Sequence, residues 1–397
     1  MAGAPLTNLA EFLLSIHTRE PVAGLTHEFY CYPARFSPLF ARAAITIFSK
    51  PGDVVLDPFM GGGTTLVEAL SLGRRALGTD INPLAAFVAE VKTTPLSESD
   101  LRSVRKWAGS LTGRLNLQLP PIRAQEWSKA GYQRHVPWPI RKTMEFILAR
   151  VSELQNARQQ RFARCALLKA TQWAIDIRKV IPSATDFRCR FFECLEEMSQ
   201  GMRAFSKAIK KASRWSESCG EVLCLCLNRS AIGLETAPEM ASLEKKPNLV
   251  VTSPPYPGVH VVYHRWQVHG RRETPAPFWV AHSLDGNGES FYTFVSRKRM
   301  DLSGYFERAY EAFSSVRALI DDGGVVVQMV AFSDPSWQLS RYLNIMSDAG
   351  FKEVSLKELA GEGSQRIWRN VPNRKWYAHQ RGSTAASKEV VLFHKPR

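Results

Sequence analysis

Short apolar runs alternate with amphipathic helical patterns in two separate parts of the chain. In the first part, apolar runs at 53–57 and 75–80 are each followed by a turn and a helical pattern, and the first of these helices begins near Thr64. This order and spacing predict a βαβ unit. A further helix, with a proline near its start, is expected at 38–49.

The second part lies beyond residue 220. It holds a long amphipathic helix at 303–322 and four apolar runs typical of strands, at 221–227, 248–253, 323–332 and 388–396. Strands that alternate with helices favour a parallel arrangement. The predicted fold class is therefore α/β, with a doubly wound, mostly parallel sheet.

A segment of different character separates the two parts. Residues 141–175 and 190–215 have helical periodicity and contain many arginines. We therefore predict a helical insertion at 97–220, between an N-terminal part (1–96) and a C-terminal part (221–397) of one α/β domain.

Composition narrows the class of partner. The 397 residues carry a formal net charge of +15, and 45% of them are hydrophobic, as in an ordinary folded protein. Such an excess of positive charge favours a polyanionic partner, either nucleic acid or an anionic membrane surface. No apolar run approaches the length of a membrane span, and the N-terminus lacks the basic start of a secretory signal, so a cytoplasmic protein is expected. The seven cysteines form no CxxC pair, so no metal site is expected.

A glycine-rich turn, 57-DPFMGGGTT-65, joins the first expected strand to its helix. Glycines let a backbone approach a ligand closely, and a helix N-terminus presents free N–H groups. No lysine follows the glycines, which excludes a phosphate-binding GxxxxGK[ST] loop. Asp80 ends the next strand, where an acidic side chain can accept hydrogen bonds from both ribose hydroxyls of a nucleotide-like ligand. The simpler alternatives are a tight turn, and a helix cap at Asp80.

These residues resemble the cofactor motif of DNA amino-methyltransferases that use S-adenosylmethionine. The resemblance implies a Rossmann-like methyltransferase fold, S-adenosylmethionine as the cofactor and double-stranded DNA as the partner. It also implies that 30-YCYPARFSPLF-40 is a further cofactor motif. Asn228 stands where the family usually has an acidic residue, and its amide oxygen can still accept a bond from the adenine amino group. The implied cofactor-binding residues are Tyr32, Pro33, Arg35, Asp57, Phe59, Gly61, Gly63, Thr64, Thr65, Asp80, Ile81, Asn82 and Asn228.

The stretch 253-SPPY-256 ends the expected strand 248–253. Its two prolines fix the backbone and push Ser253 toward an extended conformation, so a hydroxyl and an aromatic ring are held in a nearly fixed arrangement. A lone Pro-Pro turn is more often only a rigid strand exit. In the resembled family, [DNS]-P-P-[YFW] after this strand is the catalytic turn, which implies catalytic roles for Ser253, Pro254, Pro255 and Tyr256.

The chemistry of an exocyclic base amine explains these residue types. The lone pair of the amine is delocalised into the ring, so acceptors aimed at its N–H bonds would draw the nitrogen toward a tetrahedral geometry. The Ser253 hydroxyl and the Pro254 carbonyl are the candidate acceptors, and the Tyr256 ring can stack on the base and stabilise the developing charge. The reaction then rests on positioning and electrostatics, with the target base outside the duplex.

A long segment, 257–300, follows the turn and mixes basic with aromatic residues. Such a mixture suits contacts with phosphates and a wedge that fills the gap left by a flipped base; the alternative is a surface lid with solvated charges. The tail 366–381 has a similar character and is also assigned to a DNA-facing loop. The DNA-binding candidates are His264, Arg265, Trp266, Arg271 and Arg272.

The order of the motifs resembles the class in which the target-recognition region lies between the two loops, here within 97–220. In that family the serine form of the turn goes mostly with cytosine. The expected activity is therefore site-specific methylation of the N4 of a flipped cytosine by a cytoplasmic, nucleoid-associated enzyme. Three alternatives stay open: an adenine-N6 methyltransferase of the same fold, an RNA amino-methyltransferase, and a nucleic-acid-binding protein without catalysis. A restriction–modification pair, another defence system and a solitary enzyme are all compatible settings.

Overall fold

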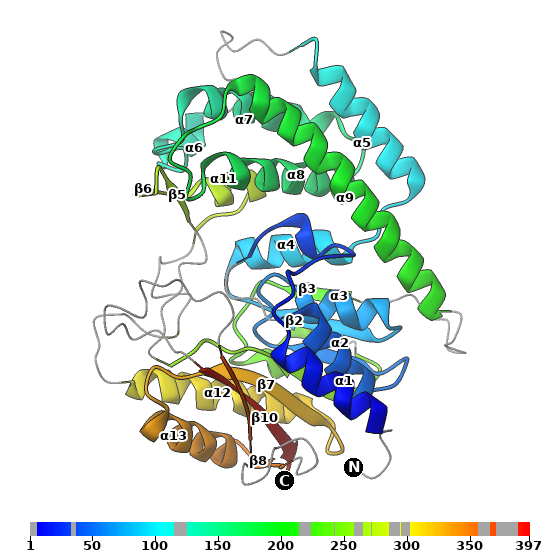
Figure 1. Cartoon of the computed structure of the whole chain (residues 1–397), viewed down its shortest axis with the longest axis vertical. Coiled ribbons are helices and arrows are strands. Elements are labelled where there is room, and N and C mark those ends of the chain that lie inside the picture. The colour runs from blue at the N-terminus through cyan, green and yellow to red at the C-terminus, as the bar shows by residue number, and fades with distance from the viewer. Residues whose placement is uncertain are drawn as a thin grey trace.

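The computed structural model describes residues 6–32, 37–114, 125–213, 224–241, 243–257, 265–270, 272–285, 294, 302–355, 366–370 and 388–397. The main sheet of this part of the chain has eight strands (Figure 1). Their order is β3 (Cys224–Leu227), β2 (Arg75–Thr79), β1 (Val54–Asp57), β4 (Leu249–Thr252), β7 (Val325–Ala331), β10 (Lys388–Pro396) and β8 (Phe351–Glu353), with β9 (Ile367–Asn370) also paired to β10.

The direction of the strands confirms the predicted fold class. The five strands from β3 to β7 run parallel, and β10 is antiparallel to β7, β8 and β9. The sheet is therefore mostly parallel, with an antiparallel end formed by the C-terminal strands.

Helices cover both faces of the sheet, as the alternation of its side chains requires (Figure 1). Val55 packs into the core on one face, whereas Val54 and Leu56 pack into the core on the other. The first core lies under α1 (Leu6–His17), α2 (Pro38–Phe48), α3 (Thr64–Ser71) and α4 (Pro83–Thr93). The second lies under α12 (Ser303–Leu319), α13 (Pro335–Asp348) and the short η3 (Leu234–Thr236) and α10 (Pro238–Ala241).

Local capping explains where several helices begin. The Ser37 side chain accepts a hydrogen bond from the backbone N–H of Leu39, and the Asn82 side chain accepts one from Leu84. A proline follows each cap at the first helical position, where its fixed φ favours the helix.

The insertion is helical, as predicted. It contains α5 (Glu98–Leu111), α6 (Gln125–Lys129), α7 (Trp138–Arg150), η2 (Val151–Glu153), α8 (Ala157–Ile175) and α9 (Ala184–Ser213). The continuous helical pattern expected at 141–175 is broken into two helices, because the Asn156 side chain caps a new helix by accepting from the N–H of Gln159.

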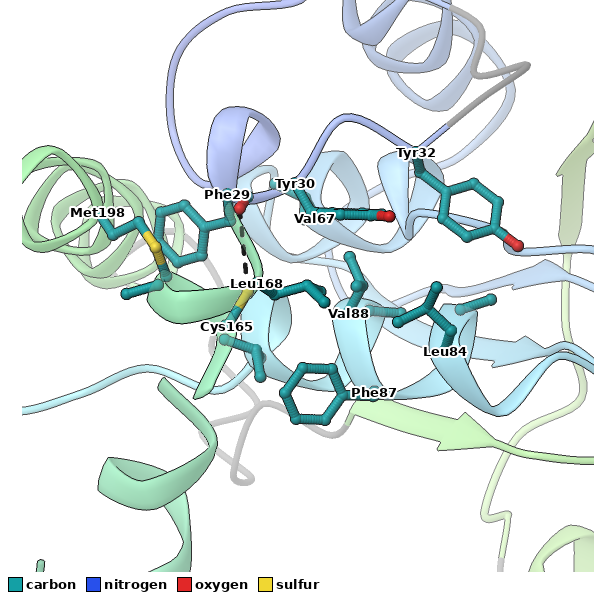
Figure 2. Packing of buried hydrophobic residues seen from close by; sticks show 14 of the residues in the cluster. Phe29, Tyr30, Tyr32, Val67, Leu84, Phe87, Val88, Cys165, Leu168 and Met198 are labelled. Atoms are coloured by element: carbon teal, nitrogen blue, oxygen red, sulfur yellow. Dashed lines mark hydrogen bonds between the residues drawn. The ribbon is translucent and has the colours of Figure 1, made fainter. Parts of the chain in front are cut away.

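The insertion shares its core with the sheet. Phe29, in the 3-10 helix η1 (His27–Phe29), contacts the Phe162 ring of α8 edge-on, with ring centroids 5.8 Å apart. In Figure 2 the Cys165 thiol of α8 donates to the Phe29 carbonyl, and Val67 of α3 and Phe87 of α4 belong to the same cluster. One hydrophobic cluster thus runs from the sheet into the insertion, so replacing the insertion with a linker would uncover core residues.

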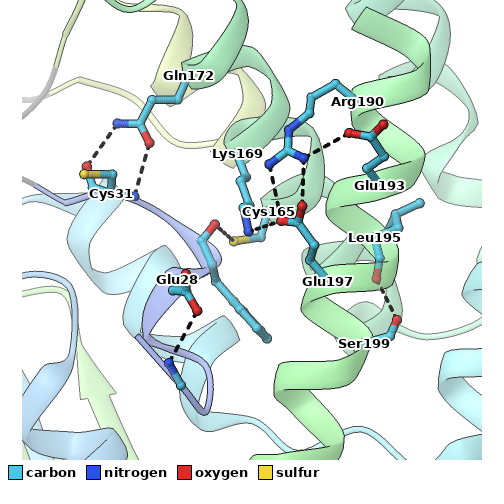
Figure 3. A network of polar contacts seen from close by, with 12 residues as sticks. Glu28, Cys31, Cys165, Lys169, Gln172, Arg190, Glu193, Leu195, Glu197 and Ser199 are labelled. Carbon is cyan, nitrogen blue, oxygen red and sulfur yellow. Dashed lines mark hydrogen bonds and ion pairs between the residues drawn. The ribbon is translucent and has the colours of Figure 1, made fainter. Parts of the chain in front are cut away.

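Several arginines of the insertion form ion pairs with nearby carboxylates. Arg190 of α9 pairs with Glu193 and Glu197, and Lys169 of α8 also contacts Glu197 (Figure 3). Further pairs are Arg105–Glu196, Arg158–Asp100, Arg161–Glu90 and Arg203–Glu98. These arginines therefore form part of a salt-bridged surface, and a role of the insertion in target recognition stays a prediction.

The segment after the turn is not one long loop where the structure describes it. It forms the hairpin β5 (Trp266–Val268) and β6 (Arg272–Thr274), followed by α11 (Ala276–Ala281). These elements lie against the insertion (Figure 1), where the Gln267 N–H donates to the Asp176 carboxylate and its carbonyl accepts from Ile177. No helix among the described residues is long and apolar enough to cross a membrane.

Candidate active site

The glycine loop and the SPPY turn leave neighbouring parallel strands, β1 and β4. After β1 the chain continues to its neighbour β2, whereas after β4 it continues to β7 in the opposite direction along the sheet. Ligands of open α/β sheets bind at such a switch point. Two hydrogen bonds join the loops here: Thr252 Oγ1 donates to Asp57 Oδ1 at 2.7 Å, and Thr65 Oγ1 donates to the Val251 carbonyl at 3.1 Å. The two motifs, far apart in sequence, therefore form one site.

The glycine loop is shaped by close backbone contacts. Gly63 has a φ of +74° and ends the loop as the cap of α3. A side chain at Gly62 would clash with Tyr32, since a Cβ there would lie 2.9 Å from the Tyr32 Cβ. The buried Lys92 ammonium donates to the Gly62 carbonyl at 2.9 Å. Glycine is thus needed for backbone conformation at position 63 and for space at position 62.

Asp80 lies at the edge of the loop and is half-buried. Its Oδ2 accepts from the N–H of Gly61 at 3.0 Å, and its Oδ1 accepts from the N–H of Asn82 at 2.8 Å. Burial raises the pKa of Asp80 to about 6, although the two backbone hydrogen bonds lower it. Each oxygen keeps a second lone-pair direction, so the carboxylate can still accept from a ligand.

Three predicted cofactor contacts are buried side chains with partners inside the protein. Asp57, Thr65 and Asn82 are 1%, 0% and 1% exposed. Burial also raises the pKa of Asp57 to about 6, although hydrogen bonds lower it, the one from Thr252 most. The Asn82 amide caps α4 and donates to the Tyr32 hydroxyl at 3.0 Å. These three side chains shape the loop, and the cofactor-binding roles that the resemblance implies for them stay predictions.

The other cofactor candidates surround the same loop. The half-buried Phe59 ring packs edge-on against Phe313, while Thr64 begins α3 and Ile81 is partly buried. Asn228, at the end of β3, is exposed and donates its amide N–H to the Asp80 carbonyl at 2.9 Å, which leaves its amide oxygen for a ligand. Pro33 and Arg35 lie outside the described residues.

The SPPY turn is held by groups from distant elements. Ser253 Oγ lies 2.9 Å from Tyr256 Oη, which lies 3.1 Å from Glu389 Oε1 on β10. The buried Tyr305 hydroxyl of α12 donates to the Pro255 carbonyl at 2.6 Å. Sequence reasoning missed both Glu389 and Tyr305, because no local pattern links them to the turn. Pro254 of the turn is buried.

The predicted DNA-binding residues do not form one exposed group. Trp266 is 1% exposed, and its indole N–H donates to the Tyr30 hydroxyl at 3.1 Å. A DNA-contacting wedge at this position was therefore wrong, because the ring belongs to the core and supports the segment before Tyr32. Arg265 contacts Asp285 at 3.3 Å, and Arg272 is exposed on β6. His264 and Arg271 lie outside the described residues.

The tail assignment needs a similar correction. Residues 367–370 are a strand paired with β10, and Arg369 is 6% exposed and bound to Glu389. This part of the tail belongs to the sheet, and residues 371–381 lie outside the described ones. Across the described residues, no group of three or more His, Cys, Asp and Glu side chains is placed to hold a metal ion.

Comparisons with known proteins agree with these motifs. The chain is 44% identical over 91 residues to the type II methyltransferase M.MvaI of Kocuria varians, covering 22% of this chain and 19% of the relative. It is 35% identical over 80 residues to the type II methyltransferase M.MjaII of Methanocaldococcus jannaschii, covering 20% and 14%. The chain thus matches less than a fifth of the length of either relative.

A solved structure, the rRNA methyltransferase AviRa of Streptomyces viridochromogenes, aligns with a TM-score of 0.36 and 10% identity over 92% of this chain and 89% of that one. Residues 14–90, which include the glycine loop and Asp80, match the family model described as DNA methylase. This part of the chain is therefore similar to N6/N4 DNA methylases.

Proposed function

We propose that the protein is an S-adenosylmethionine-dependent, site-specific DNA methyltransferase that methylates an exocyclic amino group of a base. The observation that carries this proposal is the junction of the two loops, where the Asp57 carboxylate and the Thr252 hydroxyl bind each other at the ends of β1 and β4. In the proposed function, this junction would place a cofactor-binding loop beside a turn that offers acceptors to an amine, as transfer between two bound ligands requires.

The residues present fit S-adenosylmethionine. Asp80 offers two carboxylate oxygens for the ribose hydroxyls, and Asn228 offers an amide oxygen for the adenine amino group. The tight loop at 61–63 would hold the methionine part against its backbone. The cofactor, when bound, supplies an electrophilic methyl group on its sulfonium.

The turn supplies acceptors for the attacking amine. The Ser253 hydroxyl and the Pro254 carbonyl would accept its N–H bonds and draw the nitrogen toward a tetrahedral geometry. The Tyr256 ring would stack on the base and stabilise the positive charge that develops on the nitrogen. Because these interactions strengthen as the nitrogen changes shape, they act on the transition state more than on the bound base.

We propose cytosine N4 as the acceptor atom. The support for this choice is the resemblance, in which the serine form of the turn goes mostly with cytosine; the Ser253 hydroxyl donates to Tyr256 and keeps its lone pairs for the amine. Adenine offers a similar amine beside a ring nitrogen, so the N6 of adenine is the second candidate.

The test is to identify the product. The purified protein is incubated with double-stranded DNA and isotopically labelled S-adenosylmethionine, the DNA is digested to nucleosides, and these are analysed by mass. We expect N4-methylcytosine. Only N6-methyladenine would overturn the choice of base, label found in RNA alone would favour an RNA methyltransferase, and no label in either would contradict the proposed activity.

The surface proposed to contact DNA is a basic edge made of Arg178, Lys179 and Arg272. The loop after α8 carries Arg178 and Lys179, and His269 of the β5–β6 hairpin lies 3.2 Å from the Lys179 carbonyl. Ile177 and Val180 flank these residues and are 58% and 79% exposed. Exposed apolar groups beside basic ones suit a contact with both the groove and the phosphates.

Reversing a charge on this edge should weaken DNA binding. For Lys179→Glu we expect lower affinity and a salt dependence reduced by about one unit of slope for each phosphate that the variant no longer neutralises. Binding is measured by fluorescence anisotropy from low to moderate salt. The control is Lys210→Glu, the same charge change at an exposed position near the end of α9. Equal losses of affinity in the two variants would show a general effect of net charge and contradict the assignment.

A further inference from the structure

The catalytic turn ends a chain of hydrogen bonds that runs into the core. Ser253 Oγ lies 2.9 Å from Tyr256 Oη, and Tyr256 Oη lies 3.1 Å from Glu389 Oε1. The other oxygen of that carboxylate, Glu389 Oε2, accepts from Arg369 Nε at 2.6 Å. Glu389 and Arg369 are both 6% exposed, and their backbones are paired across β10 and β9. The turn is thus tied to a buried ion pair on two strands that carry none of the recognised motifs.

We propose that Glu389 is a positioning residue that fixes the direction of this chain, so that the lone pairs of Ser253 Oγ face the reacting amine. The proposal rests on the function proposed above, since it concerns how the same turn holds the base.

The direction of the hydrogen-bond chain follows from which of its groups can donate and which can accept. A guanidinium only donates and an ionised carboxylate only accepts, so Arg369 keeps Glu389 as an acceptor. Tyr256 must then spend its single O–H on Glu389, and it can only accept from Ser253. The Ser253 proton is therefore directed at Tyr256, and only lone pairs remain for the N–H bonds of the base.

The setting of Glu389 supports a role beyond stability. A buried ion pair gains little net stability, because desolvation offsets much of its attraction. Arg369 also donates to the carbonyl of Ile16 at the end of α1 at 3.0 Å, so three separate segments hold the carboxylate in place. This fixed geometry is what an acceptor needs in order to impose one direction on a neighbouring hydroxyl.

The protein contains a matched control for Glu389 nearby. Glu353 on β8 forms a two-point ion pair with Arg366, which precedes β9, with distances of 2.6 and 2.8 Å. This pair joins the same region of the sheet, but both oxygens of the Glu353 carboxylate bind Arg366, whereas Glu389 gives one oxygen to the turn. Glu353→Gln therefore tests what the loss of a strand-to-strand carboxylate does by itself.

The activity test compares Glu389→Gln with Glu353→Gln. The glutamine amide can donate to Tyr256, which would let the chain reverse and turn the Ser253 proton toward the base. We expect kcat to fall about 10- to 100-fold for Glu389→Gln with the KM for DNA unchanged, and both constants to stay near wild type for Glu353→Gln. In a Tyr256→Phe background, which removes the link, Glu389→Gln should have little further effect. An equal loss in the presence and absence of the Tyr256 hydroxyl would overturn the proposal.

A second readout does not need activity. Tyrosine is replaced by 3-fluorotyrosine, and the ¹⁹F signal of Tyr256 is assigned as the one missing from Tyr256→Phe. We expect this signal to shift in Glu389→Gln and to stay in place in Glu353→Gln.

If wild type methylates nothing but the signal shifts, the proposed function fails and the hydrogen-bond chain stands. If the signal does not move, the chain itself is refuted, whatever the activity. Should Glu389→Gln unfold, the double variant Arg369→Gln/Glu389→Gln removes both buried charges and allows the same two measurements.

Discussion

Ser253→Ala is expected to keep its affinity for DNA and cofactor while turnover falls about 100- to 1,000-fold, as when a preorganised hydrogen-bonding group is removed from an active site. The Ser253 hydroxyl donates to Tyr256, so its lone pairs are the part available to a base. The bond they would form gains strength as the amine nitrogen becomes tetrahedral. Its loss should therefore appear in kcat more than in binding.

The measurement is single-turnover methylation with labelled cofactor, together with DNA binding by anisotropy. Ser333→Ala is the control, because the Ser333 backbone N–H donates to the Pro257 carbonyl beside the same turn while its side chain accepts from Gln338 instead. We expect the control to behave as wild type. Full activity in Ser253→Ala would remove the mechanistic role proposed for this hydroxyl.

The parts of the fold that the sequence predicted are those set by local signals. Each strand of the βαβ unit is a short apolar run, and the helix after it starts at a left-handed glycine or at a capping side chain followed by proline. The positions of β1, β4, β7 and β10 follow from apolar runs that are buried on both faces of the sheet. These signals need no knowledge of the rest of the chain.

The misjudged residues depend on contacts between distant segments. Trp266 looked like an exposed aromatic among basic residues, but its partner is Tyr30, 236 positions earlier. Arg369 lies in the tail that was assigned to a DNA-facing loop, but its partner is Glu389 on the next strand. In both cases the residue type is correct for binding nucleic acid, and only the tertiary fold shows that the polar group is already satisfied inside the protein.

Asp80→Ala is expected to weaken the binding of S-adenosylmethionine by about 1.5–3 kcal/mol, roughly 10- to 150-fold, through the loss of charge-assisted hydrogen bonds to the ribose. The fold should survive, because Asp80 is half-buried and its protein partners are backbone N–H groups in the loop. Calorimetry gives the affinity, and circular dichroism checks the fold. An affinity equal to that of wild type would contradict the assignment of Asp80 to the cofactor site.

The same carboxylate predicts a pH dependence whose sign can be worked out. Burial raises the pKa of Asp80 from 3.8 to about 6, so this group stabilises the free protein most below pH 3.8, and that contribution is lost as the pH rises through 6. A ribose needs the ionised form, so wild-type affinity for the cofactor should be highest above pH 6 and should fall as the pH drops from 7 to 5. By linkage, binding near pH 6 should release protons, which calorimetry in buffers of different ionisation enthalpy detects.

Asp57 has a similarly raised pKa of about 6, but its side chain is enclosed within the protein, so Asp80→Asn separates the two carboxylates. A fall in affinity that persists unchanged in Asp80→Asn would assign the titration to another group.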